Sequence, residues 1–212
     1  MPLHKKIEID PKSTILIWKI TESYSDLFNA ISLKENSLTR LNGMKSESHQ
    51  KGFLAVRMLL QQAGYTDFDL YYDAFGKPNL QDGKSISISH SFEFSVVVLS
   101  DKNIGIDLEL RRDLVIKIAR KFAEEEFVYQ SENNSEDFKS KLTVIWGVKE
   151  SVFKVRNEVG ISFKDHIFVR PFEMIEEKTT ALLDYDGLKR EFLVYFTEIE
   201  LYTLVWLWEY QK

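Results

Sequence analysis

Asp107 and Glu109 stand two residues apart in a segment that alternates apolar and polar residues from 104 to 109. This period of two predicts a strand with its apolar residues on one face and both carboxylates on the other, which Gly105 leaves sterically open. Mg²⁺ prefers oxygen ligands and commonly combines one or two carboxylates with substrate phosphates. The pair could therefore hold a metal ion that also contacts a phosphate-bearing substrate. The alternative is a solvated face of an antiparallel strand.

A predicted helix at residues 142–155 places a second carboxylate and a cation together. At about 100° per residue, Glu150 lies opposite the apolar stripe and Lys154 follows one turn later on the same face. An ordinary surface ion pair, worth about 0.3–0.5 kcal/mol, is the alternative. Trp146 and Phe153 lie beside the charged face, which favours a partly enclosed cleft. The stripe consists of Ile145, Val148, Val152 and Val155.

Two further segments could contact phosphates. Ser89 and His90 close a predicted strand, and a histidine there could donate to a phosphate oxygen or simply end the strand. The Gly76-Lys77-Pro78 segment could cradle a nucleotide or be a plain turn. The chain lacks the Gly-x-x-x-x-Gly-Lys-Ser/Thr, Gly-x-Gly-x-x-Gly, His-Glu-x-x-His and Gly-x-Ser-x-Gly motifs. Common nucleotide-hydrolase, dinucleotide, zinc-protease and esterase interpretations therefore lose support.

The elements that must position these residues follow from periodicity and turn residues. In the first half we expect one or two helices within 24–63, stopped at Gly64, and a loop at 75–80. Strands are expected at 15–20, 69–73, 86–90 and 95–100, the last two forming an antiparallel meander with the acidic strand.

In the second half we expect a helix at 114–130 and another at 142–155, joined by a flexible polar stretch at 131–140. Asp186-Gly187 predicts a hairpin between 178–185 and 188–196, followed by a third strand at 201–210. Both halves combine helices with a small sheet, so the sequence predicts an α+β fold of two similar subdomains, residues 1–102 and 103–212, although no clear internal repeat is visible.

Composition sets further bounds. With 44% hydrophobic and 29% charged residues among 212, the chain is typical of soluble globular proteins. The net charge of −5 disfavours nucleic acid as a partner, and the absence of cysteine excludes disulfides and thiolate nucleophiles. No signal peptide and no apolar run near the roughly 20 residues of a membrane span is present, so we expect a cytoplasmic protein without membrane partners.

Four motifs in order closely resemble the 4′-phosphopantetheinyl transferase superfamily, in its longer, surfactin-synthetase-activating type. They are Phe-Gly-Lys-Pro at 75–78, Ser-Ile-Ser-His at 87–90, Gly-Ile-Asp-Leu-Glu at 105–109 and Trp-Gly-Val-Lys-Glu-Ser-Val-Phe-Lys at 146–154. The segment 121–126 resembles that family's Phe-rich segment ending in Glu, so the resemblance spans about residues 71–155. It implies two related α/β halves with the active site between them.

The resemblance also implies a reaction, in which the phosphopantetheine arm of coenzyme A moves to a serine of an apo carrier protein and adenosine 3′,5′-bisphosphate is released. Asp107, Glu109 and Glu150 would bind Mg²⁺, and Glu150 would be a general base, directly or through water. Lys154 and His90 would neutralise the leaving group. The nucleotide pocket would include Lys77, Pro78, Ser89 and His90, with Lys149 near the phosphates.

One segment departs from the family. Where an arginine-rich helix often meets the 3′-phosphate, this chain offers Lys51 and Arg57. We expect the predicted 114–130 helix and the polar stretch that follows it to form much of the carrier docking surface, because carrier proteins of this kind present acidic helices. The cations concerned are Arg111, Arg112, Lys117, Arg120 and Lys121. A monomer is expected. The alternatives are a non-catalytic module that binds coenzyme A or an acyl carrier, and a Mg²⁺-dependent hydrolase of nucleotide pyrophosphates.

Overall fold

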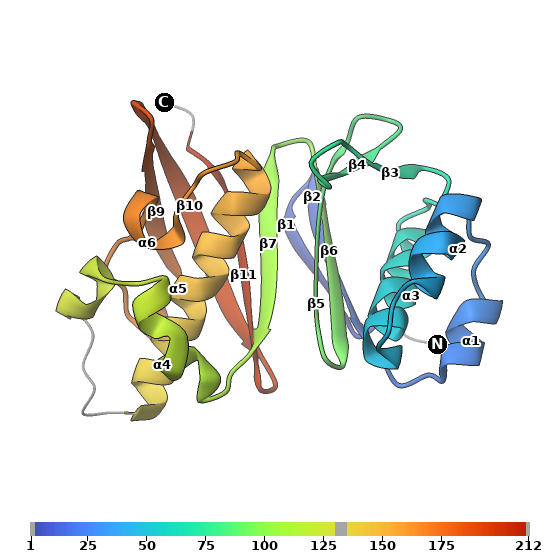
Figure 1. Cartoon of the computed structure of the whole chain (residues 1–212), viewed down its shortest axis with the longest axis horizontal. Coiled ribbons are helices and arrows are strands. Elements are labelled where there is room, and N and C mark those ends of the chain that lie inside the picture. Colours follow the sequence, from blue (N-terminus) through green and yellow to red (C-terminus); the bar gives the residue numbers. More distant parts are fainter. Residues whose placement is uncertain (1–2, 130–134, 211–212) are drawn as a thin grey trace. The chain divides into compact units, whose positions relative to one another are not determined.

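The computed structural model describes residues 3–129 and 135–210. The chain divides into two compact units, Met1–Lys102 and Asn103–Lys212 (Figure 1). Each unit combines helices with antiparallel β-sheet, so the predicted α+β class is confirmed.

The first unit is built on a four-stranded antiparallel sheet in the order β1-β2-β6-β5. Every residue of β6 is buried, as expected for a central strand with three consecutive valines. The strands are β1 (Lys5–Asp10), β2 (Ser13–Lys19), β5 (Ser85–Ser91) and β6 (Phe94–Ser100). A separate ribbon pairs β3 (Leu70–Tyr72) with β4 (Pro78–Leu80). The predicted loop at 75–80 is therefore wrong at its end, where Pro78 begins a short edge strand that needs no N–H from it.

Three helices accompany this sheet, α1 (Tyr24–Asn29), α2 (Glu35–Asn42) and α3 (Glu47–Gln62). The long α3 packs on β2 and β6, with Ala55, Val56 and Leu59 in the core. The prediction of one or two helices at 24–63 is wrong, because three form there. The buried Asp67 accepts hydrogen bonds from the Lys34 N–H and from Ser37 Oγ, and so stabilises the start of α2. A residue more than thirty positions away provides this stabilisation.

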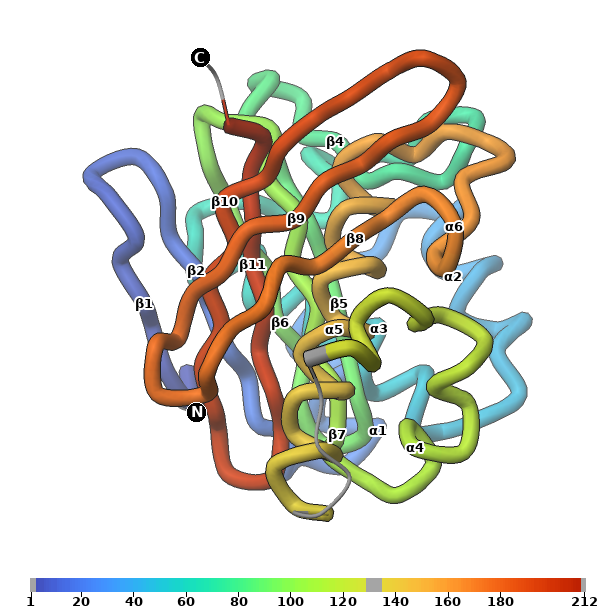
Figure 2. Tube along the Cα trace, turned by 90° about the vertical axis from the view of Figure 1, so that its left-hand side faces the viewer, coloured from blue at the N-terminus to red at the C-terminus, as the bar shows by residue number. Residues whose placement is uncertain are grey.

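The second unit contains a five-stranded antiparallel sheet in the order β7-β11-β10-β9-β8. The strands are β7 (Ile104–Leu110), β8 (Ile167–Val169), β9 (Lys178–Tyr185), β10 (Leu188–Ile199) and β11 (Tyr202–Glu209). In Figure 2 the strands β8 to β11 run side by side. The hairpin around Asp186-Gly187 and the third C-terminal strand are confirmed.

Helix α5 (Ser135–Arg156) lies along β7 and β11 (Figure 1). The shorter helices are α4 (Leu114–Ile118) and α6 (Phe163–His166), with 3₁₀ turns at Ala119–Lys121, Glu125–Tyr129 and Met174–Glu176. The single helix predicted at 114–130 is wrong. The chain turns there so that Phe122, Ala123 and Glu126 are all buried. Within the predicted flexible stretch, 135–140 is the start of α5, and 131–134 lies outside the described residues.

The predicted meander is also wrong in its third strand. Strands β5 and β6 pair as expected, but β7 pairs with β11, almost a hundred residues along the chain. Local pattern identifies a strand, whereas its partner is decided by which sheet buries its apolar face.

Candidate active site: a carboxylate cluster and a basic cavity

Helix α5 approaches β7 at Gly105. A Cβ atom placed on Gly105 would clash with the Ser151 carbonyl oxygen and lie 2.9 Å from Val155 Cγ2. On the helix side, a Cβ on Gly147 would lie 2.8 Å from Val205 Cγ2 of β11. The face predicted to be open is therefore covered by α5, and the prediction of an open face is wrong. Glycine at 105 leaves room for a helix rather than for solvent.

This contact brings the acidic strand and the charged helix face together. The Asp107 side chain is buried, and its Oδ1 accepts a hydrogen bond of 2.7 Å from Lys154 Nζ. The same ammonium donates to the Ile106 carbonyl oxygen at 2.9 Å. The i,i+4 ion pair of Lys154 with Glu150, weighed above, is absent from the ion pairs of the described residues. Lys154 instead contacts the strand.

Glu109 lies one strand period beyond Asp107 and is half-buried. Its Oε1 accepts a 3.0 Å hydrogen bond from the Trp146 indole N–H. Burial, together with the charge of Asp107, raises the pKa of Glu109 to about 7. A carboxylate crowded by a like charge takes up a cation readily, because the cation relieves the repulsion.

Glu150, half-buried on α5, is the third carboxylate of this group. Burial and the charge of Asp107 raise its pKa as well, against the effect of Lys154. Thus the three side chains predicted to bind metal influence one another electrostatically. Their hard oxygen donors suit Mg²⁺, which needs only one or two carboxylates beside phosphate and water. Among the described residues, no group of three or more histidine, cysteine, aspartate or glutamate side chains is arranged as a complete metal site. Lys154 and Trp146 each contact one carboxylate oxygen of this group.

Lys149 lies elsewhere. Its side chain is fully buried, with Nζ 2.7 Å from Glu126 Oε1 and 3.0 Å from the Phe163 carbonyl oxygen that accepts its hydrogen bond. Burial lowers the pKa of Lys149. Glu126 Oε1 also accepts from the Val169 N–H. The expectation that Lys149 meets phosphates is therefore corrected, because this ammonium links α5 to the 3₁₀ turn at 125–129.

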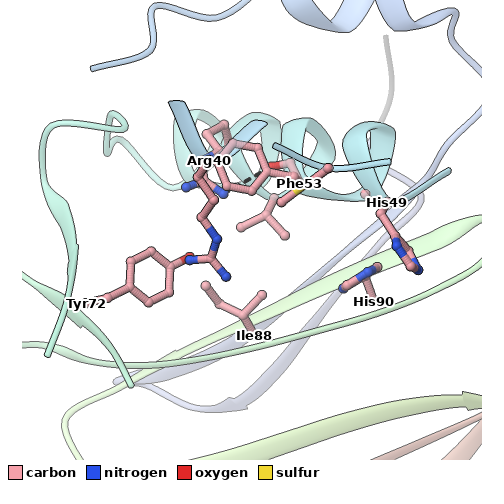
Figure 3. A pocket seen from close by; sticks show the side chains of 10 residues that line it. Arg40, His49, Phe53, Tyr72, Ile88 and His90 are labelled. Atoms are coloured by element: carbon pink, nitrogen blue, oxygen red, sulfur yellow. Dashed lines mark hydrogen bonds between the residues drawn. The ribbon is translucent and has the colours of Figure 1, made fainter. Parts of the chain in front are cut away.

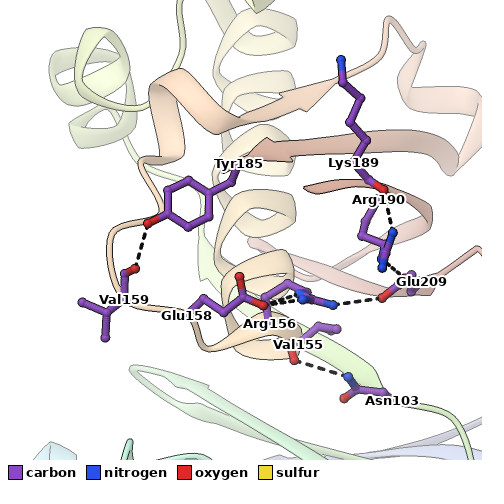
Figure 4. Close-up of polar contacts among 9 residues, drawn as sticks. All are labelled: Asn103, Val155, Arg156, Glu158, Val159, Tyr185, Lys189, Arg190 and Glu209. Carbon is purple, nitrogen blue, oxygen red and sulfur yellow. Dashed lines mark hydrogen bonds and ion pairs between the residues drawn. The ribbon is translucent and has the colours of Figure 1, made fainter. Parts of the chain in front are cut away.

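The C-terminal end of α5, which carries Lys154, is tied to the sheet. Arg156 pairs with Glu158 and, at 3.4 Å, with Glu209 of β11, while Arg190 Nε of β10 lies 2.8 Å from the same carboxylate (Figure 4). Beyond this end, Tyr185 of β9 donates to the Val159 carbonyl oxygen at 3.1 Å. The last turn of α5 is thus tied to β11 through Arg156 and Glu209, and the segment after the helix is tied to β9 through Tyr185 and Val159.

A second candidate region is a cavity of about 260 Å³ in the first unit (Figure 3). His90, at the end of β5, lies in its wall beside His49 of α3, and the two rings are 5.8 Å apart. Gly52 makes this possible, because a Cβ there would lie 2.8 Å from His90 Cδ2. The lining also includes Arg40, Met44, Phe53, Val56, Arg57, Tyr72 and Ile88.

Arg40, which sequence reasoning missed, is the exposed cation of this cavity. Its guanidinium stacks over the Tyr72 ring at 4.6 Å, and Figure 3 shows it pointing into the space beside Ile88. Arg57 also lines the cavity, but its Nε is 2.9 Å from Asp67 Oδ1 and both side chains are buried. Lys51 is not among the lining residues. The one sequence signal that could have identified Arg40 is its place as the basic residue in the last turn of α2.

The remaining predicted binding residues lie near this region without lining the cavity. Ser89 is buried on β5, directly before His90. Pro78 pairs with Tyr72 in the β3-β4 ribbon, and Asp73 Oδ1 accepts from the Lys77 N–H at 2.9 Å. The ribbon therefore holds the Gly76-Lys77-Pro78 turn next to a cavity-lining tyrosine.

Comparison with known proteins supports the motif-based resemblance. Residues 103–197 match the family model described as the 4′-phosphopantetheinyl transferase superfamily. The "4′-phosphopantetheinyl transferase gsp" of Aneurinibacillus migulanus is 27% identical over 126 residues, which cover 59% of this chain and 51% of that protein. The match thus spans about half the length of that relative. The resemblance is confirmed at the level of the superfamily. In the described part of the chain, no helix has the length and apolar character needed to cross a membrane.

Proposed function

We propose that this protein transfers phosphopantetheine from coenzyme A to a carrier-protein serine, because residues 103–197 match the family model described as the 4′-phosphopantetheinyl transferase superfamily. The serine oxygen forms a bond to the phosphorus that bears the pantetheine arm. The bond from that phosphorus to the bridging pyrophosphate oxygen breaks, and adenosine 3′,5′-bisphosphate leaves with both electrons. The serine proton goes to a carboxylate of the enzyme.

The contact of β7 with α5 is the observation that carries this proposal. It groups Asp107, Glu109 and Glu150 with Lys154, the set that a reaction on a pyrophosphate requires. Bound Mg²⁺ would neutralise charge on the pyrophosphate. We assign metal binding to the three carboxylates. Glu150, whose pKa is raised by burial, is the proposed acceptor of the serine proton, directly or through water. Lys154 is the proposed partner of the leaving oxygen.

The cavity of the first unit is the proposed nucleotide site. Arg40 supplies a planar cation that suits a phosphate, and Tyr72 beneath it keeps the guanidinium in place. His49 and His90 add nitrogen donors at the other end of the cavity. We therefore assign the 3′-phosphate to Arg40 rather than to Lys51 or Arg57, and keep Lys77, Pro78 and Ser89 as neighbouring contacts.

Mass spectrometry of an apo carrier protein tests the transfer. Incubation with this protein, coenzyme A and Mg²⁺ should add the phosphopantetheine mass at one serine, and EDTA or a serine-to-alanine carrier should prevent it. Asp107→Asn should abolish the gain, whereas Asp101→Asn, at an exposed carboxylate in the preceding turn, should not. A binding module would hold coenzyme A without any gain, and a hydrolase would consume coenzyme A without modifying the carrier. Either result would contradict the proposal.

The role of Arg40 has its own test. Arg40→Gln should raise the KM for coenzyme A about tenfold or more but leave the KM for 3′-dephospho-coenzyme A nearly unchanged, since a lost charged hydrogen bond is worth about 1.5–3 kcal/mol. Arg170→Gln, at an exposed arginine of the second unit, is the control. Equal losses for both substrates would refute the assignment.

A further inference from the structure

Trp146 contacts the carboxylate cluster of Asp107, Glu109 and Glu150 but carries no charge itself. Trp146 lies in α5, and its indole N–H donates a hydrogen bond of 3.0 Å to Glu109 Oε1. An indole has one donor and no acceptor, so it fixes one carboxylate oxygen and leaves the other oxygen to accept a different partner.

The indole itself is held by other aromatic rings. Phe122 meets it edge-on, with ring centroids 5.0 Å apart and an interplanar angle of 69°. Phe163 packs on it at 5.6 Å and 56°, and Phe163 is in turn held by Phe153 at 5.8 Å. Rings packed in this way lock the rotamer of the tryptophan, so the direction of its N–H is set before any ligand arrives.

Glu109 needs such a partner. Asp107 is held by Lys154, but Lys154 reaches Asp107 Oδ1 and the Ile106 carbonyl oxygen, and neither of these contacts fixes Glu109. A glutamate has one more rotatable bond than an aspartate, and its orientation toward a cation depends on what binds its other oxygen. Among the described side chains, the indole N–H is the donor to this carboxylate.

We propose that Trp146 is a positioning residue that aims the Glu109 carboxylate at the divalent cation. This rests on the proposed function, in which Glu109 is a metal ligand. Trp146 acts through Glu109 and contacts neither substrate nor metal. The chain thus uses the aromatic cluster of the second unit to orient its charged cluster, and not only to fill the core.

Direct metal binding tests this role. We would titrate Mn²⁺, as a paramagnetic substitute for Mg²⁺, into protein saturated with coenzyme A, and measure free Mn²⁺ by electron paramagnetic resonance. Trp146→Phe keeps an aromatic ring and removes the N–H, so the Kd for Mn²⁺ should rise about 10–100-fold. Trp206→Phe is the matched control, because Trp206 Nε1 has no hydrogen-bond partner among the described residues. Its Kd should not change.

Two further measurements separate orientation from packing. Replacing Trp146 by 3-benzothienylalanine keeps the shape of the indole and lacks the N–H, so it should weaken Mn²⁺ binding as Trp146→Phe does without lowering the melting temperature. In a Glu109→Gln background, Trp146→Phe should have little additional effect on the Kd.

The outcomes distinguish the positioning role of Trp146 from the proposed metal-dependent transfer. Suppose that the wild type binds Mn²⁺ and modifies the carrier, and that the benzothienylalanine variant binds Mn²⁺ with the same affinity. This result would overturn the positioning role of Trp146 and leave the proposed function standing. An equal loss of affinity from Trp146→Phe with and without Glu109 also overturns the positioning role. Wild-type protein that binds no Mn²⁺ contradicts the metal-dependent function as well.

Discussion

At the scale of single residues, Lys154 has a different partner from the one that helical spacing suggested. It contacts Asp107 on β7 rather than Glu150 on its own helix. The Asp107 side chain is only 4% exposed and that of Lys154 is 27% exposed, so the pair is shielded from water on the aspartate side. The ammonium therefore balances a buried charge in the metal-free protein and remains reachable from solvent.

Lys154→Met should reduce transfer far more than stability. A cation that stabilises a leaving oxygen is worth about 10²–10³ in kcat. With Mg²⁺ present, the metal ion would balance the buried Asp107 charge in place of the ammonium, which limits the loss of stability. Mg²⁺ should raise the melting temperature of the variant more than that of the wild type, because Asp107 has lost its resident cation. Lys139→Met removes an ion-paired lysine from the same helix and is the control for both the rate and the melting curve. A large loss of melting temperature with unchanged turnover would make Lys154 purely structural.

Glu109 should make the metal-free protein less stable as pH rises. Its folded-state pKa of about 7 lies above the ordinary value of 4.5, so between these values the folded protein holds a proton that the unfolded chain has released. The stabilisation is complete below pH 4.5 and is lost through pH 7, by about 1–3 kcal/mol.

Urea unfolding in EDTA between pH 4.5 and 8 measures this effect. The free energy of unfolding of the wild type, relative to Glu109→Gln, should fall across that interval. Parallel profiles for the two proteins would show that Glu109 titrates alike in the folded and unfolded states.

At the scale of elements, the closeness of α5 to the sheet decides whether the charged residues meet. Gly105 on β7 and Gly147 on α5 each occupy a point where a Cβ would be nearer than 3.0 Å to the opposite element. Close helix-strand packing brings Lys154 within hydrogen-bonding distance of Asp107. Core packing and site assembly therefore depend on the same contact.

Gly105→Ala should consequently disturb both stability and metal binding. The added methyl group meets backbone at Ser151, which has no flexible end to move, so we expect a loss of about 3 kcal/mol or more in the free energy of unfolding. Gly43→Ala is the control, because its nearest neighbours would lie 3.5 and 3.6 Å away. If Gly105→Ala unfolds like the wild type, α5 does not pack as described.

At the scale of the whole molecule, charge is unevenly distributed. The chain carries a net charge of −5, yet cations follow one another from Arg111 to Lys121. The structure removes Arg111 from this set, because it pairs with Glu198 and donates to the Glu200 carbonyl oxygen at 2.9 Å. The exposed positions are Arg112, Lys117, Arg120 and Lys121. We keep this surface as the proposed docking site for an acidic carrier.

Reversing Arg112 and Lys117 to Glu should raise the carrier KM by about tenfold or more at low salt, because electrostatic steering speeds encounter. The KM for coenzyme A should stay nearly constant, and the carrier effect should shrink as salt increases. Lys5→Glu with Lys178→Glu, at exposed positions on β1 and β9, gives the same charge change elsewhere. Equal effects from both double variants would mean that net charge, rather than this surface, governs docking.

Much of this arrangement follows from local pattern. Alternation identified β7, β10 and β11, the Asp-Gly turn fixed the C-terminal hairpin, and the spacing of four motifs identified the superfamily. Local pattern failed where distant residues decide the conformation. Asp67 supports the start of α2, and burial of Glu126 against Lys149 breaks the segment that looked like one helix.

Sequence by itself determined which residues carry charge, on which face of each element they stand, and which family their order resembles. Tertiary structure decided their partners. Lys149 and Lys154 belong to one motif and one helix, yet one is buried against Glu126 and the other reaches Asp107. The Arg40 guanidinium stacks on the Tyr72 ring in the wall of the cavity, and the Trp146 indole N–H donates to Glu109. Periodicity specifies the face of a helix or strand from which a side chain projects. A contact also requires that another helix or strand be packed against that face.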